Sequence, residues 1–271
     1  MLKLSELKIV ESKEALKDIP EGKVLINCVY AHSFNVAQKD ALFAEALRTV
    51  HGSGFMVHGS GFMVNGSEEC VKYLIPDGAS IVKACRMLKA KSQPKERIAG
   101  WDLFSFEMER VERKSEKRIV NSEKCLKVMF MGSSEKVLGL IKERAAKDYP
   151  HLEVVTYSPP YKLEFSEEDN RAIIRAINEA DPDLLWIGMT APKQEKWTYR
   201  HWKDLNIHCH VGTIGAVFDF YAGTAKRAPL WWQKHSLEWL YRLVKEPRRM
   251  WRRYVIGNPL FLWNVFKEKG A

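Results

Sequence analysis

Residues 184–197 have the sequence LLWIGMTAPKQEKW, a short apolar run followed by a turn with glycine and proline and then a polar helix start. An apolar run of this length, bounded by turn residues, is typical of a strand buried on both faces of a parallel sheet. Similar runs lie at 24–29, 97–99, 128–131, 152–156, 184–189 and 207–211, and helical patterns at 39–48, 80–88, 103–112, 135–146, 167–180 and 194–202. The alternation predicts an α/β fold, a Rossmann-like, mostly parallel sheet flanked by helices.

Ligands of such sheets bind at the carboxyl ends of the strands. Three predicted strands end in glycine-bearing turns, at Gly132, Gly188 and Gly215, and the turn after Gly188 leads to Gln194 at a helix start. Free backbone N–H groups at such a start favour an anion, so the set suggests a nucleotide diphosphate. The alternative stays open, because a glycine after a strand is usually only a turn, and no dinucleotide or P-loop pattern is present.

Two aspartate motifs are predicted at opposite edges of the sheet. Asp77 follows the apolar run 74–76 and precedes the helix at Ser80, so its carboxylate could act as a general base, although Pro-Asp-Gly is also a common turn. Asp181-Pro182-Asp183 precedes its strand and therefore belongs to the amino edge, where we expect a turn and not a metal site.

The positive charge is concentrated at the C-terminus. The chain has 43 Lys and Arg against 34 Asp and Glu, and its last 48 residues carry eleven basic residues against three Glu. Residues 236–245 and 248–255 fit two amphipathic helices joined at Glu246-Pro247. Tryptophans and tyrosines lie among the arginines, a composition that suits an anionic membrane surface or a polyphosphate, although a basic face is often only a solvated face.

These features predict a core at residues 1–223 and an appendage at 224–271. The apolar run 255–266 is interrupted by Gly257-Asn258-Pro259 and is too short to span a bilayer, so we expect peripheral attachment. The first twenty residues lack the apolar region of a secretory signal, which predicts a cytoplasmic location. The five cysteines have no paired spacing, and His208-Cys209-His210 lacks further ligands, so neither disulfides nor a metal site is expected.

An ordered set of motifs carries a resemblance to a known family. The motifs are IPDG at 75–78, AGWDLF at 99–104, SPPY at 158–161, PKQE at 192–195, the glycines 212 and 215 with FDF at 218–220, LEWLYR at 237–242, EPRR at 246–249 and RY at 253–254. Together they resemble the bacterial N-acetylmannosaminyltransferases of the WecG/TagA/CpsF type (glycosyltransferase family 26), which assemble teichoic acid, common antigen and capsule. The resemblance covers residues 24–266.

The resemblance implies an inverting, metal-independent glycosyltransferase without a cofactor. The donor would be a UDP-sugar carrying N-acetylmannosamine or its uronate. The acceptor would be an undecaprenyl-diphosphate-linked amino sugar at the cytoplasmic membrane face. It implies a catalytic base at Asp77 and a residue near the reacting sugar at Gln194. It also implies uracil and ribose contacts at Tyr161 and Asp219, and lipid-diphosphate contacts at Arg242, Arg249 and Arg252.

Two features depart from the family. Asn27-Cys28-Val29-Tyr30 stands where Asn-Thr-x-Asn is common, which leaves a catalytically degenerate lipid binder as an alternative. HGSGFMV occurs twice in residues 51–64, within a predicted insertion at 51–70 that is either a surface loop or a lid. A nucleic-acid binder is a weaker alternative, since it leaves Asp77 and Gln194 unexplained, and no nucleic-acid partner is expected. The sequence does not decide whether the protein forms a homo-oligomer.

Overall fold

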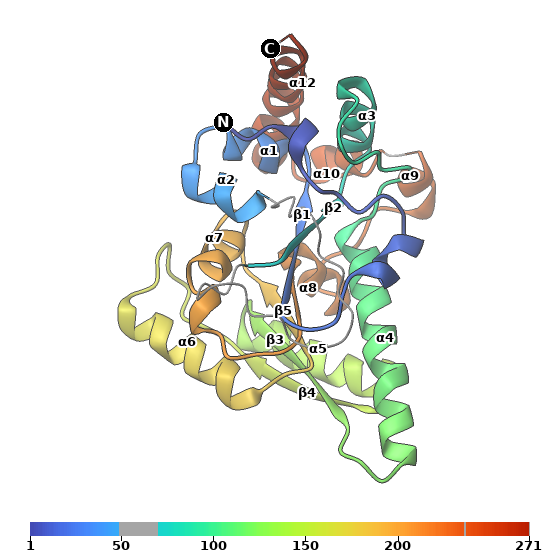
Figure 1. Cartoon of the computed structure of the whole chain (residues 1–271), viewed down its shortest axis with the longest axis vertical. Helices are drawn as coiled ribbons and strands as arrows, with labels where there is room; N and C mark the ends of the chain where they lie inside the picture. Colours follow the sequence, from blue (N-terminus) through green and yellow to red (C-terminus); the bar gives the residue numbers. More distant parts are fainter. Residues whose placement is uncertain (49–69, 236, 271) are drawn as a thin grey trace.

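The computed structural model describes residues 1–48, 70–235 and 237–270, and of Lys234 and Arg249 it describes only the backbone. Within these residues six strands form a parallel sheet in the order β2-β1-β6-β5-β3-β4 (Figure 1). The strands are β1 (Val24–Val29), β2 (Lys72–Pro76), β3 (Leu126–Gly132), β4 (Leu152–Tyr157), β5 (Leu184–Gly188) and β6 (His210–Thr213). Because all are parallel, their carboxyl ends lie along one edge of the sheet. The predicted α/β fold is confirmed.

The helices flank the sheet or extend from it. The connecting helices are α1 (Ala31–Ala37), α2 (Ala41–Leu47), α3 (Ala79–Leu88), α4 (Gly100–Val120), α5 (Glu135–Asp148), α6 (Glu167–Ala180), α7 (Lys193–Arg200) and α8 (Gly215–Tyr221). The C-terminal appendage comprises α9 (Leu230–Lys234), α10 (Glu238–Lys245), α11 (Pro247–Trp251), the π-helical turn η4 (Arg252–Ile256) and α12 (Gly257–Lys269). Helix α6 starts with a capping box, since Ser166 and Asp169 each accept a hydrogen bond from the other's backbone N–H.

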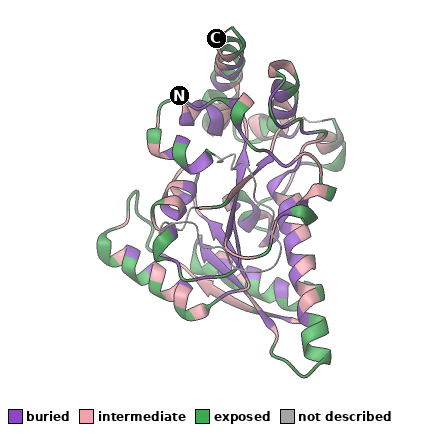
Figure 2. Ribbon diagram, viewed as in Figure 1, coloured by how far each residue is buried: buried purple, intermediate pink, exposed green. Residues whose placement is uncertain are grey.

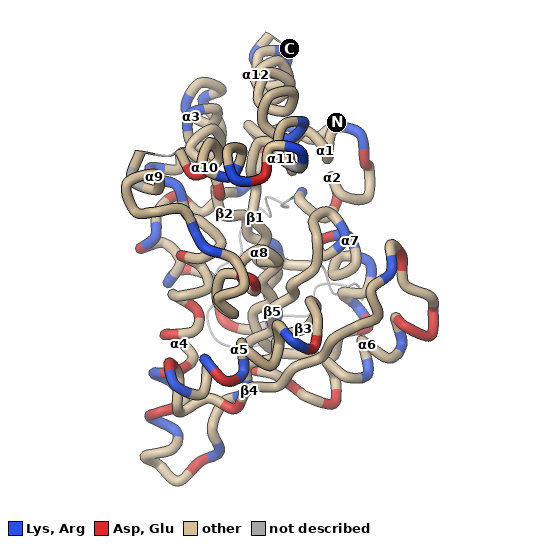
Figure 3. Tube along the Cα trace, turned by 180° about the vertical axis from the view of Figure 1, so that it is seen from behind, with Lys and Arg blue, Asp and Glu red and all other residues tan. Residues whose placement is uncertain are grey.

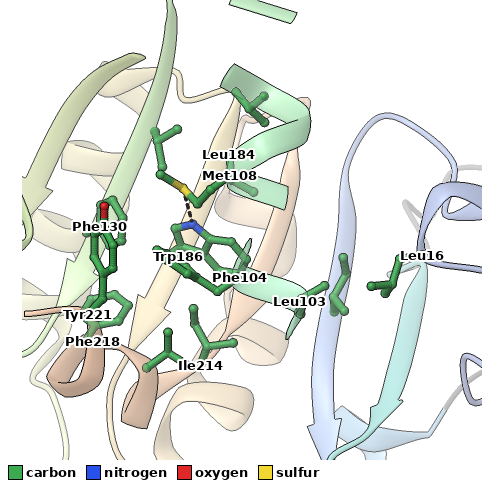
Figure 4. Close-up of a cluster of buried hydrophobic side chains, with 14 of the residues drawn as sticks. Leu16, Leu103, Phe104, Met108, Phe130, Leu184, Trp186, Ile214, Phe218 and Tyr221 are labelled. Carbon is green, nitrogen blue, oxygen red and sulfur yellow. Dashed lines mark hydrogen bonds between the residues drawn. The ribbon is translucent and has the colours of Figure 1, made fainter. Parts of the chain in front are cut away.

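Side chains alternate between the two faces of the central strands, and both faces are buried (Figure 2). One face packs under α4, α5 and α8, where Trp186 contacts Phe104 and donates its indole N–H to Met108 Sδ at 3.4 Å (Figure 4). The opposite face packs against α6 and α7 around Ile187 and Trp197. A third cluster joins β2 and helices α1–α3 to the N-terminal residues and to α12. The core therefore encloses the sheet and leaves its carboxyl edge to the loops.

The strand predictions were wrong in three places. The chain segment 72–76, which ends at proline, forms the edge strand β2, and an edge strand accepts proline because its outer N–H groups need no partner. Residues 97–99 form no strand, since only Ile98 N–H reaches a strand, donating to Pro76 O at 3.1 Å, before α4 begins. The last strand lies at His210–Thr213, later than the predicted 207–211.

The helix predictions need corrections as well. Helix α1 was missed, and α4 extends well beyond the predicted 103–112. Helix α12 was also missed; Gly257-Asn258-Pro259, which interrupts the apolar run 255–266 in the sequence, begins it, because a proline in the first helical turn lacks only an N–H that has no helical partner. The predicted insertion at 51–70, with its repeat, lies outside the described residues except for Cys70.

Candidate functional site

Asp77 lies directly after β2, at the carboxyl edge of the sheet. Its backbone N–H donates to Val29 O at 2.9 Å, which ties the end of β2 to the end of β1. The side chain of Asp77 is 31% exposed, so its carboxylate can reach both solvent and a bound molecule. A carboxylate at such a position can accept a proton from a ligand hydroxyl.

Arg97 is the charged partner of Asp77. The hydrogen bond from Ile98 to Pro76 holds the chain before α4 beside the end of β2, and Arg97 Nη2 lies 3.5 Å from Asp77 Oδ1. Burial alone would lower the pKa of Arg97, but the carboxylates of Asp77 and Glu238 raise it above the ordinary value. The guanidinium therefore stays positively charged. Sequence reasoning missed Arg97 because its segment was predicted to be a strand.

Gln194 connects two neighbouring strand ends. It is only 4% exposed, and its Oε1 accepts hydrogen bonds from Met189 N at 3.1 Å and Gly215 N at 3.2 Å. Its Nε2 donates to Glu195 Oε1 at 2.9 Å. Two backbone N–H groups that the sequence suggested for an anion are thus bonded to Gln194, which fixes the loops after β5 and β6 to each other.

Glu195 is a buried carboxyl group that sequence reasoning missed. It is 2% exposed, and its Oε2 has no hydrogen-bond partner among the described residues. Burial raises the pKa of Glu195 to about 7, although the hydrogen bond from Gln194 opposes the rise. The signal in the sequence was its place beside Gln194 in the PKQE motif.

Tyr30 and Cys28, at the end of β1, lie in the electrostatic field of Asp77 and Glu195. Burial raises the pKa of the Cys28 thiol and of the Tyr30 phenol, and both carboxylates raise them further. Both groups are therefore neutral near pH 7. The Tyr30 ring also lies under the guanidinium of Arg253, 4.8 Å from its centroid, so a residue of η4 reaches the ends of β1 and β2.

The three predicted glycines lie on the neighbouring strand ends of β3, β5 and β6. Each is needed for close packing: an added Cβ would lie 2.4 Å from Gly188 O at Gly132, 2.4 Å from the Phe218 ring at Gly188, and 2.1 Å from Met189 O at Gly215. Gly132 also has a φ of +122°, which side-chain-bearing residues rarely adopt. Packing accounts for all three glycines without a ligand.

Tyr161 lies far along the carboxyl edge of the sheet from Asp77. Tyr161 follows β4, and Asp77 follows β2, so the two belong to opposite edge strands of the sheet. At about 4.8 Å per strand, they are roughly 24 Å apart. Tyr161 is fully exposed, and Asp219 is exposed on α8, where its Oδ1 and backbone O accept hydrogen bonds from Thr224.

The appendage arginines differ in their surroundings. Arg242 lies over the Phe220 ring at 5.2 Å, next to Asp219, whereas Arg252 is exposed and stacks on Trp251 at 5.6 Å. The side chain of Arg249 lies outside the described residues. Lys and Arg gather at α10 and α11, while the body of α12 carries little charge (Figure 3).

Two sets of contacts hold the appendage on the core. At α10, Glu238 is buried and pairs with Arg97 and Arg227. At α12, Phe261 packs edge-on against Phe34 at 5.8 Å, and the Glu268 carboxylate accepts hydrogen bonds from the backbone N–H groups of residues 4 and 5. Figure 1 shows α12 at the same end of the molecule as the N-terminus and α3.

Exposed apolar side chains are concentrated in the appendage. Of the sixteen large apolar residues that are exposed in the described part of the chain, ten belong to it. They are Leu230, Trp231, Trp239, Val244, Trp251, Val255, Ile256, Leu262, Trp263 and Phe266. Of the apolar side chains in the predicted amphipathic helix 248–255, Met250 is the only one buried in the described part of the chain. Exposed apolar residues at this density are typical of an interaction surface.

None of the helices in the described residues has both the length and the apolar character needed to cross a membrane.

Metal ligands do not cluster in the described residues. No group of three or more His, Cys, Asp or Glu side chains there could hold a metal ion. Asp183 Oδ2 accepts a hydrogen bond from Lys127 N at 2.8 Å, and Asp181 ends α6 in a left-handed conformation. The Asp-Pro-Asp motif is thus a turn at the amino edge, as predicted.

Comparison with known proteins gives one consistent result. Residues 68–271 match the model of the "Glycosyl transferase WecG/TagA/CpsF family". A Bacillus subtilis protein named N-acetylglucosaminyldiphosphoundecaprenol N-acetyl-beta-D-mannosaminyltransferase is 31% identical over 73% of this chain and 69% of its own length. Proteins of the same name from Bacillus spizizenii and Staphylococcus aureus are 29% and 28% identical, each over 73% of this chain and 70% of their own.

Proposed function

The chain belongs to the WecG/TagA/CpsF family of glycosyltransferases, and on that premise we propose that it transfers an N-acetylmannosamine-like sugar from a UDP donor to an undecaprenyl-diphosphate-linked amino sugar. The relatives' name states the transfer of N-acetylmannosamine to N-acetylglucosaminyldiphosphoundecaprenol. The product would serve the synthesis of a cell-surface polysaccharide of the capsule, exopolysaccharide or teichoic-acid type.

The observation that carries the proposal is the position of Asp77, a partly exposed carboxylate at the carboxyl edge of the sheet beside a docked basic appendage. In the proposed reaction Asp77 accepts the proton of the acceptor hydroxyl as its oxygen attacks the anomeric carbon. The bond from that carbon to the diphosphate breaks on the opposite side, UDP leaves with the bonding electrons, and the configuration of the sugar inverts.

The donor would lie along the strand ends between β2 and β4. Gly132 and Gly215 let backbone segments approach closely there, Gly188 makes room for the Phe218 ring, and Gln194 fixes two of the loops. Tyr161 and Asp219 would contact uracil and ribose, with the diphosphate between them and Asp77. Backbone and side-chain donors would stabilise the leaving group, and we propose that no metal ion is required.

The protein would work while attached to the inner face of the cytoplasmic membrane. The exposed apolar side chains of the appendage and its adjacent arginines suit the boundary between acyl chains and anionic headgroups. Arg242, Arg249 and Arg252 would contact the lipid diphosphate, because guanidinium groups bind paired phosphate oxygens.

A direct assay tests the proposal. The purified protein is incubated with a panel of UDP-sugars and a short-chain lipid-diphosphate amino sugar, and UDP release and glycolipid product are measured with and without chelator. We expect release with an N-acetylmannosamine-type donor, dependent on the acceptor and resistant to the chelator. Restoration of a chelated, inactive enzyme by magnesium or manganese would refute metal independence. Acceptor binding with no transfer from any donor would instead favour a degenerate lipid binder, in which Cys28 and Tyr30 replace groups needed for activity.

A further inference from the structure

Glu238 is the first residue of α10 in the appendage. It contacts Arg97, the arginine that lies beside the proposed catalytic base Asp77. Its side chain is largely buried, and its Oε1 accepts a hydrogen bond from Arg227 Nε at 3.3 Å. Its Oε2 contacts Arg97 Nη2. Two guanidinium groups therefore neutralise one buried carboxylate, an arrangement that offsets the cost of removing the charge from water.

Arg97 Nη2 is shared between two carboxylates. The same nitrogen that contacts Glu238 lies 3.5 Å from Asp77 Oδ1. A charge-assisted hydrogen bond from guanidinium to carboxylate normally measures about 2.7–2.9 Å. Arg97 is therefore ion-paired in direct contact with Glu238 and only near Asp77, and the lone pairs of Asp77 remain available to another donor.

This sharing matters because a base needs a free lone pair. A guanidinium that closed onto Asp77 with two parallel hydrogen bonds would occupy its oxygens and stabilise the charged carboxylate, making it a poorer proton acceptor. The other acid near Arg97 is Asp102, which already accepts a hydrogen bond from Ala99 N and pairs with Lys13. Without Glu238, Arg97 would therefore turn to Asp77.

We infer that Glu238 is a positioning residue of the appendage, which holds Arg97 away from Asp77 and so keeps the base free when α10 is docked. The inference rests on the proposed function, in which Asp77 is the base. Through Glu238 the appendage would then contribute to the chemical step, in addition to any contact with lipid. An enzyme whose α10 has left the core would carry Asp77 paired with Arg97 and would be slow.

The test compares Glu238→Gln with Arg227→Gln, which removes the other partner of Glu238 and leaves Arg97 untouched. We expect E238Q to lower kcat about tenfold with little change in KM for the UDP-sugar, and R227Q to keep kcat within about twofold. In an Arg97→Gln background, the further change E238Q should alter kcat less than about twofold, because the guanidinium that Glu238 holds in place is absent. Fully additive effects, or a kcat of E238Q equal to that of the wild type, would overturn the inference.

A crystal structure of the E238Q variant provides a readout that does not depend on activity. We expect Arg97 to close onto Asp77, with a nitrogen-to-oxygen distance below about 3.0 Å. An unchanged separation with α10 still docked would overturn the inference. Absence of transfer by the wild-type protein would count against the proposed function, whereas the Arg97 geometry would be decided by the crystal structure alone.

Discussion

At the scale of single residues, Asp77 is the group to which the proposed chemistry assigns the proton transfer. Replacing Asp77 with Asn keeps the shape of the side chain but removes the basic oxygen. We expect turnover to fall about 100-fold or more while UDP still binds. Turnover is followed by UDP release and binding by calorimetry. Asp181→Asn is the matched control, because Asp181 is exposed at the amino edge in a left-handed conformation that Asn tolerates, and it should leave turnover unchanged. A fully active D77N enzyme would refute the base assignment.

Glu195 predicts a pH dependence of stability. Its pKa is raised from 4.5 to about 7 by burial, so the folded state binds its proton more tightly than the unfolded state does. The contribution of this group to stability is therefore fully present below pH 4.5 and is lost as the pH rises through about 7. A shift of this size corresponds to about 3 kcal/mol.

The comparison of wild type with Glu195→Gln isolates that contribution. Urea unfolding at pH 5 and pH 8 should show the wild type losing up to about 3 kcal/mol more than E195Q over this interval. The neutral amide keeps an oxygen that can accept the hydrogen bond from Gln194 Nε2. Equal pH dependence in the two proteins would mean that Glu195 stays ionised in the fold.

Only some of the residues in the candidate site could be placed there from the sequence. Asp77 could be placed at the carboxyl edge because an apolar run precedes it and a helix follows it. Arg97, Glu195 and Arg253 could not, since their roles depend on which chain segments meet at that edge. Arg97 reaches Asp77 across twenty residues of sequence through one backbone hydrogen bond, and no local pattern predicts such a contact.

At the scale of secondary-structure elements, the apolar periodicity predicted the buried strands and the edge strand β4 but missed the other edge strand, β2. Strands β1, β3 and β5 are buried along nearly their whole length and appear as apolar runs, broken only by Asn27 in β1 and Lys127 in β3. β2 lies at the edge, is only half-buried at its start and ends in proline, so its sequence lacks that signal. Helix α12 was not predicted, and Pro259, which interrupts the apolar run 255–266 in the sequence, lies in the first turn of this helix.

The close packing around Gly188, at the end of β5, predicts that a larger residue there would destabilise the fold. At Gly188 an added methyl group would lie 2.4 Å from the ring of Phe218, a buried residue of α8. Gly188→Ala should therefore lower the free energy of unfolding by about 1–3 kcal/mol through overpacking. Gly139→Ala is the control, since Gly139 lies on exposed α5 surface with no atom within 4 Å of the added Cβ. That change should raise stability by about 0.5–1 kcal/mol. Urea unfolding measures both, and a G188A protein as stable as the wild type would disprove the packing role.

At the scale of the whole molecule, the core and the appendage differ in how far their apolar side chains are exposed. The core buries its apolar residues on both faces of the sheet, whereas the appendage leaves half of its large apolar side chains exposed beside its arginines. The two parts are joined at the carboxyl edge through Glu238 and Arg253, so a surface bound by the appendage would lie next to the proposed acceptor site. Under the proposed function, this arrangement brings a lipid-linked acceptor to Asp77 while the core holds the donor.

The last prediction concerns attachment to membranes. Each basic residue near an anionic surface contributes about 1 kcal/mol, so Arg249→Glu with Arg252→Glu should weaken binding to phosphatidylserine-containing vesicles by at least about 30-fold. Added salt should reduce wild-type binding in the same direction, because it screens the charges. Trp251→Glu with Trp263→Glu should also release the protein, since both side chains are exposed and would lose apolar contact with the acyl boundary.

Val120→Glu is the matched control for vesicle binding, because Val120 is 79% exposed at the far end of α4, away from α12 (Figure 1). Vesicle co-sedimentation measures binding, and transfer to a long-chain acceptor in vesicles measures the consequence, with the fold checked by circular dichroism. Both appendage variants should lose transfer to the long-chain acceptor and keep their affinity for UDP. If they sediment with vesicles as the wild type and V120E do, the arginines and tryptophans are only a solvated face, and the appendage would have to reach its lipid substrate by other contacts.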